Sequence, residues 1–194
     1  MSLRPALYAI DLQRFREALT ADRSVTLRSA ARHLLALDCG LDQADVRRAA
    51  DELLSGGFDG RTELDTHVYA IVTIAQALGF QSEASEIHFG DWPIGAYHEY
   101  LDLLAPVLPA VSREIYAHFL AGRPLIGDGI DTEWSYYSFL WAQEVRHLLS
   151  DLSQIHAMTP ALNTKECIHG FPNEFRGWLN EVVRRSADLW VFAE

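Results

Sequence analysis

Apolar side chains recur every three or four residues along most of the chain, which predicts a mostly helical protein. A first helix is capped by Asp11 and a last one by Asn173. Pro106 and Pro109 separate two of the helices, because proline is excluded from a helix interior. The helical segments between the two ends are 24–37, 42–54, 63–79, 96–105, 109–121 and about 141–152. Residues 154–172 lack this period and are predicted to form a long loop.

Three short runs have the composition of strands. They lie at 7–10, at 134–137, which is rich in aromatic residues, and at 189–192. A single hairpin is marginal in water, so the three runs are expected to pair in one small sheet covered by helices. The last run is apolar at every position, as is typical of a strand buried on both faces. It is therefore predicted to be a central strand.

No repeat, low-complexity tract or linker separates these segments, so the pattern predicts a single domain over residues 1–194. Its class is α+β, mostly helical with about seven helices and a small sheet of about three strands formed by the N-terminal, middle and C-terminal runs. A chain of this length with 49% hydrophobic residues can bury a core without disulfides. Cys39 and Cys167 have neither CxxC nor metal-ligand spacing, which favours reduced thiols in the cytosol.

The longest apolar stretch covers residues 68–80 and is interrupted by Thr73 and Gln76. It is too short to span a bilayer, which takes about 20 apolar residues. The start of the chain has no apolar core of a secretory signal. We therefore expect a cytoplasmic protein that does not enter a membrane.

Charge is distributed unevenly along the chain. Residues 1–62 carry nine acids and nine arginines, so the net charge of −11 resides in residues 63–194. Within 63–133, eleven acids stand against only Arg113 and Arg123. A folded acidic surface attracts basic partners and repels nucleic acid. The charge therefore favours a basic protein partner and no nucleic-acid binding.

Three stretches together resemble a set of bacterial proteins. Residues 8–12 (YAIDL) are similar to a YAxDL-type strand that leads into a helix. Residues 136–145 are similar to an aromatic segment that runs into an xxEEV helix. Residues 176–179 (RGWL) and the run 188–192 are similar to an RGWL-type helix followed by a short apolar strand. In these respects the chain resembles the YfbM-like family and an actinobacterial group of domains of unknown function.

The resemblance implies an α+β fold and supplies no activity. Two features depart from the family pattern. The family often begins its middle helix with Thr-Pro, whereas this chain has Trp141 and Ala142 there. Residues 81–133 have no clear counterpart. Function must therefore be sought in this chain's own residues.

The sequence has no motif of nucleophilic catalysis or nucleotide binding. Ser135 and Ser138 lack a GxSxG elbow, and the Gly-containing stretch 122–127 lacks the Lys-Ser/Thr of a phosphate loop. Two arginine pairs, at 47–48 and 184–185, have acids nearby, so they do not form a nucleic-acid footprint. These observations favour a protein that is not an enzyme, and they predict no cofactor.

Two predicted loops, 86–93 and 128–134, combine carboxylates with tryptophan. A tryptophan next to carboxylates can hold an Arg or Lys of a partner through stacking and a charge-assisted hydrogen bond. The alternative is a tryptophan that anchors each loop to the core beside solvated acids. The candidate partner-binding residues are Asp91, Trp92, Asp128, Asp131, Glu133 and Trp134.

A metal centre is the second candidate site. Glu63 and His67 lie four residues apart, as do Glu114 and His118, and at this spacing two side chains share a helix face. Together with His88 they could ligate a metal if the helices pack together. The alternative for the two helical histidines is a hydrogen-bonded place in the core.

The leading hypothesis is a non-enzymatic cytosolic module whose acidic 63–133 region binds a basic protein, in the manner of an immunity or antitoxin-like inhibitor. The alternative is a metal-assisted hydrolase or small-molecule-binding protein that uses the histidines and glutamates just named. A third interpretation is an acidic surface that serves solubility alone. The sequence does not predict an oligomeric state.

Overall fold

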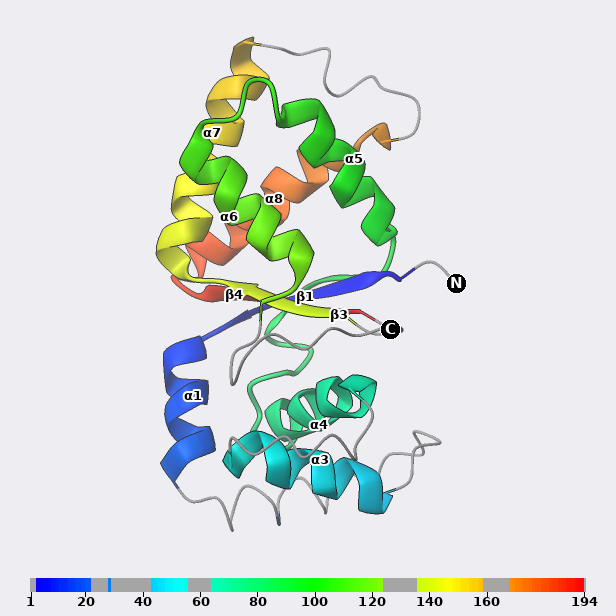
Figure 1. The fold of residues 1–194 in the computed structure, drawn as a ribbon. Coiled ribbons are helices and arrows are strands. Elements are labelled where there is room, and N and C mark those ends of the chain that lie inside the picture. Colours follow the sequence, from blue (N-terminus) through cyan, green and yellow to red (C-terminus); the bar gives the residue numbers. More distant parts are fainter. Residues whose placement is uncertain are drawn as a thin grey trace.

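The structure is a computed structural model that describes residues 3–21, 28, 43–55, 64–123, 136–158 and 168–193. Within these ranges, seven helices accompany a four-stranded antiparallel sheet (Figure 1). The helices are α1 (Leu12–Ala21), α3 (Gln43–Ser55), α4 (Leu64–Ala77), α5 (Ile94–Leu104), α6 (Ala110–Ala121), α7 (Ala142–Met158) and α8 (Phe171–Arg184). The strands are β1 (Pro5–Ile10), β2 (Glu86–Phe89), β3 (Tyr136–Leu140) and β4 (Asp188–Ala193). The predicted mostly helical α+β class is confirmed.

The strand order in the sheet is β2-β1-β4-β3, and every neighbouring pair is antiparallel. β4 pairs along its whole length with β1, so that Pro5 lies opposite Ala193. Its other side pairs with β3. The predicted central position of the last run is therefore confirmed. β2 is a fourth strand that the sequence pattern did not predict.

The sheet carries one hydrophobic core on each face. Successive side chains of a strand point to opposite faces, and in β4 this places Leu189 and Val191 in one core and Trp190 and Phe192 in the other. Helices α5 to α8 cover the first face, while α1, α3 and α4 lie on the second (Figure 1). The domain is thus a three-layer arrangement with the sheet in the middle.

Aromatic residues dominate the core under α5 to α8. Most of their ring pairs meet edge to face or tilted, with centroids 4.6 to 6.3 Å apart. Burial of each such side chain stabilises the fold by roughly 1.5–3 kcal/mol. The fully buried rings are those of Tyr97, Tyr100, Tyr116, Phe119, Phe171 and Phe175.

The helices predicted at 42–54, 63–79, 96–105 and 109–121 are confirmed as α3, α4, α5 and α6. Proline sets the boundary between the last two. α5 ends at Leu104, and α6 begins at Ala110, directly after Pro109. Proline suits this place because its missing N–H is not needed at the start of a helix.

Several predicted boundaries were wrong. Both ends of the loop predicted at 154–172 are helical, because α7 continues to Met158 and α8 already begins at Phe171, and residues 159–167 lie outside the described residues. Asn173 therefore lies inside the first turn of α8 and does not cap it; Gly170 does, with a positive φ of 91°. The strand predicted at 134–137 continues to Leu140 as β3, and residues 134–135 lie outside the described residues. The helix predicted at 24–37 also lies outside them, except for the helical Arg28.

Asp188 joins two helix N-termini to the end of the sheet. Its Oδ2 accepts a hydrogen bond from the N–H of Leu12 at 2.9 Å, and its Oδ1 accepts one from the N–H of Ala142 at 2.6 Å. These residues begin α1 and α7, whose first amides have no partner within the helix. One carboxylate thus caps helices on both faces of the sheet.

Among the described residues, no helix has the length and hydropathy needed to cross a membrane.

Candidate functional site

The segment between α4 and α5 forms an open edge of the sheet. β2 pairs with β1 on one side, and among the described strands none lies on its other side. The N–H of Gly90 donates to the carbonyl of Pro5 at 3.1 Å. Because hydrogen-bonded and non-hydrogen-bonded pairs alternate in an antiparallel ladder, the N–H and C=O of Phe89 point away from β1. Among the described residues no group pairs with them, and such groups on an edge strand can pair with another chain.

A tight turn at residues 82–85 brings the chain into β2. Ser82 donates its N–H to Oγ of Ser85 at 2.9 Å, and the N–H of Glu86 donates to the carbonyl of Ser82 at 3.0 Å. The pairing register between β1 and β2 shifts between Leu7 and Tyr8. Only four residues of mixed polarity form β2, so its strand character depends on pairing with β1.

Phe89 is the exposed apolar side chain of this edge. It lies opposite Ala6 and is 67% exposed. Its neighbour His88 points to the other face of the sheet, towards α8, where it is buried. The edge therefore offers a phenyl ring and main-chain hydrogen-bonding groups together.

His88 fixes the chain after β2 in place. Its ring stacks on Trp178 with centroids 3.9 Å apart, and its Nε2 accepts the N–H of Asp91 at 3.3 Å. Burial lowers the pKa of His88, although the carboxylates of Asp91, Glu174 and Glu86 act in the opposite direction. The imidazole is therefore neutral at pH 7, and three carboxylates surround it.

Trp92 anchors the same segment to α8. Its Nε1 donates to Oε2 of Glu174 at 3.0 Å, and its ring meets Phe171 edge to face at 5.4 Å. These contacts are those of the anchoring tryptophan that the sequence left as an alternative. Asp91, directly before it, is exposed.

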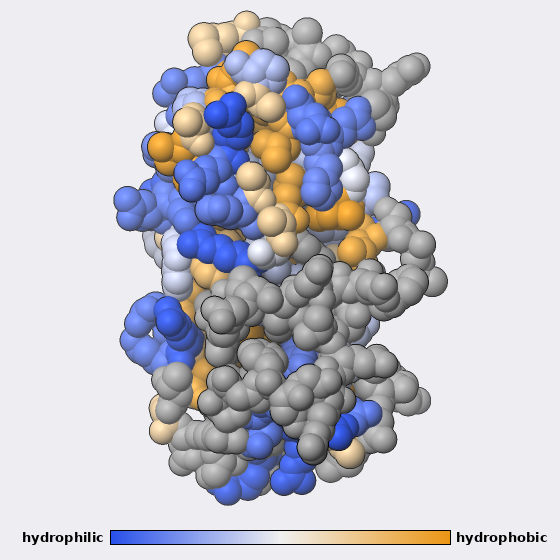
Figure 2. Space-filling view, in the orientation of Figure 1, coloured by the Kyte–Doolittle hydropathy of each residue, from blue (hydrophilic) through white to orange (hydrophobic). Residues whose placement is uncertain are grey.

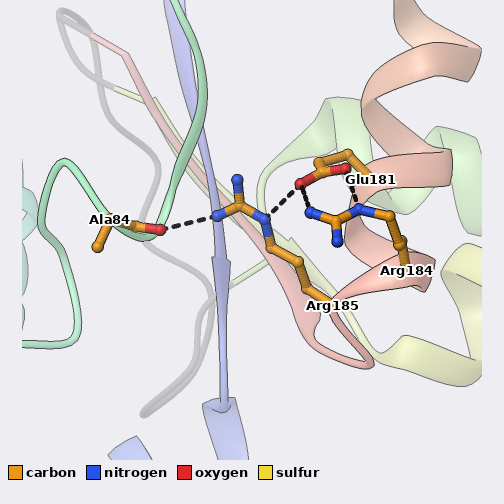
Figure 3. Close-up of polar contacts among 4 residues, drawn as sticks. All are labelled: Ala84, Glu181, Arg184 and Arg185. Atoms are coloured by element: carbon orange, nitrogen blue, oxygen red, sulfur yellow. Dashed lines mark hydrogen bonds and ion pairs between the residues drawn. The ribbon is translucent and has the colours of Figure 1, made fainter.

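The far end of α8 holds the turn that precedes β2 (Figure 3). Nη1 of Arg185 donates to the carbonyl of Ala84 at 2.8 Å, and Glu181 accepts from Nε of the same arginine at 2.7 Å. Hydrogen bonds from Arg184 and Arg185 lower the pKa of Glu181 to about 2. The arginine pair is thus engaged within the fold, as expected from its neighbouring acids.

The edge is acidic. Residues 81–93 contain three carboxylates, Glu83, Glu86 and Asp91, and no lysine or arginine. Glu174 adds a fourth carboxylate from α8. Two arginines contact this segment: Nη1 of Arg4 lies 3.3 Å from the carbonyl oxygen of Gly90, and Arg185, which is paired with Glu181, donates to the carbonyl of Ala84. The local charge is therefore negative around an exposed phenyl ring.

The chain matches no protein-family model, no curated protein and no solved structure. The resemblance to the YfbM-like family therefore stays a prediction. What the protein does has to be inferred from its own geometry.

Four of the six predicted partner-binding residues lie outside the described residues. Asp128, Asp131, Glu133 and Trp134 lie outside the described residues, as does Glu63 of the predicted metal set. Asp91 and Trp92 are described, and they lie side by side at the acidic edge.

The described members of the predicted metal set are not brought together. His67 on α4 and His118 on α6 belong to helices on opposite faces of the sheet, and His88 lies at the sheet edge. Glu114 and His118 are exposed on α6. Among the described residues, no group of three His, Cys, Asp or Glu side chains could hold a metal ion.

His67 has a partner that sequence spacing did not reveal. Its Nε2 lies 2.7 Å from Oε2 of Glu52, and both side chains are buried between α3 and α4. The pattern suggested Glu63, one helical turn before the histidine. No local signal points to Glu52, because the contact depends on how two helices pack.

Proposed function

We propose that the protein is a non-enzymatic cytosolic interaction module that binds an extended basic segment of a partner protein along β2. The observation that carries this proposal is the open edge of β2, where exposed Phe89 stands among carboxylates. A partner strand would pair with the outward main-chain groups of β2. Its Arg or Lys side chains would meet Glu86 and Asp91, and its apolar side chains would cover the phenyl ring.

This mode of binding fits an inhibitor of a basic protein, in the manner of an immunity or antitoxin-like module. The net charge of −11 speeds the encounter with a basic partner through electrostatic steering. Main-chain pairing supplies affinity at little cost in conformational entropy, because the contacts of His88 and Trp92 already hold the edge in place.

The test is affinity capture from lysate of the protein's own organism at about 50 mM and about 500 mM salt. Two variants address the edge. Phe89→Pro removes the outward N–H and the phenyl ring, and proline is tolerated where an edge N–H faces solvent. Asp91→Asn removes one charge. Asp102→Asn, at an exposed position of α5, is the matched control.

We expect a basic protein to be retained at low salt by the wild type and by Asp102→Asn, and to be released at high salt. Asp91→Asn should retain about tenfold less of it, since a hydrogen bond to a charged group contributes about 1.5 kcal/mol or more. Phe89→Pro should also retain about tenfold less, because it loses a main-chain hydrogen bond together with the apolar contact of the ring. Retention that is indifferent to salt, or equal for all variants, would contradict the proposal.

A further inference from the structure

A groove of about 820 Å³ lies between α6 and the first two turns of α7. It borders the residue that follows β3, at the sheet edge opposite β2. A volume of roughly 300–1,000 Å³ is typical of small-molecule sites. The described residues that line this groove are Val111, Ile115, Trp141, Gln143, Glu144, Arg146 and His147.

The apolar part of the groove is unusually accessible. Val111 is 57% exposed, and Ile115, one turn further along α6, is half-buried. Trp141 packs edge to face on Phe139 with centroids 5.1 Å apart, which fixes its ring in the groove. Over α5 and α6, hydrophobic residues reach the surface among hydrophilic ones (Figure 2). The groove thus offers an aromatic and aliphatic wall to a ligand.

The carboxylate in the groove is already compensated. Both oxygens of Glu144 accept from Nη1 of Arg123, at 2.8 and 2.7 Å, and Oε2 also accepts the N–H of Trp141 at 2.9 Å. The Arg123 guanidinium lies over the ring of Phe139, 4.6 Å from its centroid. Glu144 is itself half-buried in this ion pair.

Among the described lining residues, Arg146 carries a positive charge that no other described residue compensates. Arg146 is exposed and forms no hydrogen bond or ion pair with another described residue. His147 is half exposed, and its Nε2 lies 3.8 Å from Asp151, which accepts a shorter bond of 2.7 Å from Ser112. A guanidinium that has no partner among the described residues and lies beside a neutral apolar wall is complementary to an anion with an apolar body.

We propose that this groove binds a small organic carboxylate, with the carboxylate at Arg146 and an apolar or aromatic body against Trp141 and Ile115. The ligand class follows from the juxtaposition of Arg146, which no other described residue pairs with, and the apolar wall on the neighbouring helix. The site is independent of the proposed partner surface, because it lies at the other edge of the sheet.

Isothermal titration with two naphthalene compounds of the same shape tests the proposal. 1-Naphthaleneacetate carries the carboxylate, and 1-naphthaleneacetamide is its neutral counterpart. The wild type should bind the acetate about tenfold more tightly than the amide, since a charge-assisted pair is about twice as strong as a neutral one. Arg146→Gln should abolish this preference and leave the amide's affinity unchanged.

Two controls separate the site from general effects. Arg47→Gln removes an exposed arginine from α3, on the other face of the sheet, and should keep the tenfold preference. Phe89→Pro should keep it as well, although it removes the proposed partner edge.

Val111→Asp tests the apolar wall. It should lower the affinity for both compounds, because it places a charge on that wall.

Three results would overturn the proposal. One is equal affinity for the acetate and the amide in the wild type. Another is an unchanged preference in Arg146→Gln. The last is no binding of either compound up to about 5 mM, which is the result expected if the groove instead receives a helix of another protein.

Discussion

Tyr100 and His156 form a buried polar pair in the aromatic core. Their Oη and Nε2 atoms lie 2.6 Å apart. Burial lowers the pKa of His156 to about 4, and the charge of Arg176 adds to this effect. Burial also raises the pKa of Tyr100. Both side chains are therefore neutral at pH 7, and the tyrosine hydroxyl donates to the imidazole.

This pair predicts a loss of stability in mild acid. In the unfolded chain the pKa of a histidine is about 6.5, so the unfolded state binds the proton first as the pH falls. The contribution of His156 is complete above pH 6.5 and is lost as the pH falls towards 4. It amounts to about 3 kcal/mol for the shift from 6.5 to about 4. Urea unfolding at pH 7, 5.5 and 4.5 measures it.

The matched variants are His156→Phe combined with Tyr100→Phe, which removes both polar groups from the core, and His98→Gln, which removes an exposed histidine of α5. The double variant should lose most of the decline between pH 6.5 and 4.5, while His98→Gln should keep it. An identical decline in all three proteins would show that other groups cause it.

Asp188 couples elements that are otherwise separate. Its two oxygens cap α1 on one face of the sheet and α7 on the other. A cap contributes about 1 kcal/mol, and asparagine retains only one acceptor oxygen. Asp188→Ala should therefore lower the free energy of unfolding by about 2 kcal/mol and Asp188→Asn by about 1 kcal/mol.

Denaturant unfolding at pH 7 measures these differences. Asp102→Ala, which removes an exposed carboxylate from the last turn of α5, is the control and should change the free energy by less than about 0.5 kcal/mol. If Asp188→Ala is as stable as the wild type, the two bonds do not contribute to the fold.

Elements bounded by strong local signals could be predicted from the sequence. α5 and α6 have apolar periodicity and are separated by Pro106 and Pro109. β2 could not be predicted, because its four residues become a strand only by pairing with β1, some 80 residues earlier. Asn173 misled the prediction of α8, since a residue suited to a cap lies in the first turn after Gly170.

The candidate site shows the same division. The prediction of Asp91 and Trp92 as partner-binding residues rests on composition, because a carboxylate and a tryptophan are adjacent in the sequence. The bond from Trp92 to Glu174 spans 82 positions, and no local pattern predicts it. The same holds for the pairing of His67 with Glu52, which depends on the packing of α3 against α4.

The whole molecule has two cores that share one sheet. Alternate residues of β1 and β4 enter opposite cores, so neither core can form without the same strands. We therefore predict one cooperative unfolding transition. Leu179→Ala on α8 and Ile71→Ala on α4 each create a cavity, and each should lower the free energy of unfolding by about 2–5 kcal/mol.

Urea unfolding followed by far-ultraviolet circular dichroism and by tryptophan fluorescence tests this prediction. Trp178 and Trp190 report on the two faces. Both variants should move a single midpoint that the two signals share. Two separated midpoints, with Ile71→Ala moving only one of them, would show that the layers unfold independently.

The pairing of Pro5 with Ala193 also has a consequence for synthesis on the ribosome. β1 emerges early, but its central neighbour is not translated until residues 188–193. Until then, β2 is the one described strand with which β1 can pair, and a two-stranded unit is marginal in water. Because contacts between distant residues slow folding, the sheet must assemble late and slowly. The exposed apolar strand makes the nascent chain a substrate for chaperones that bind extended hydrophobic segments.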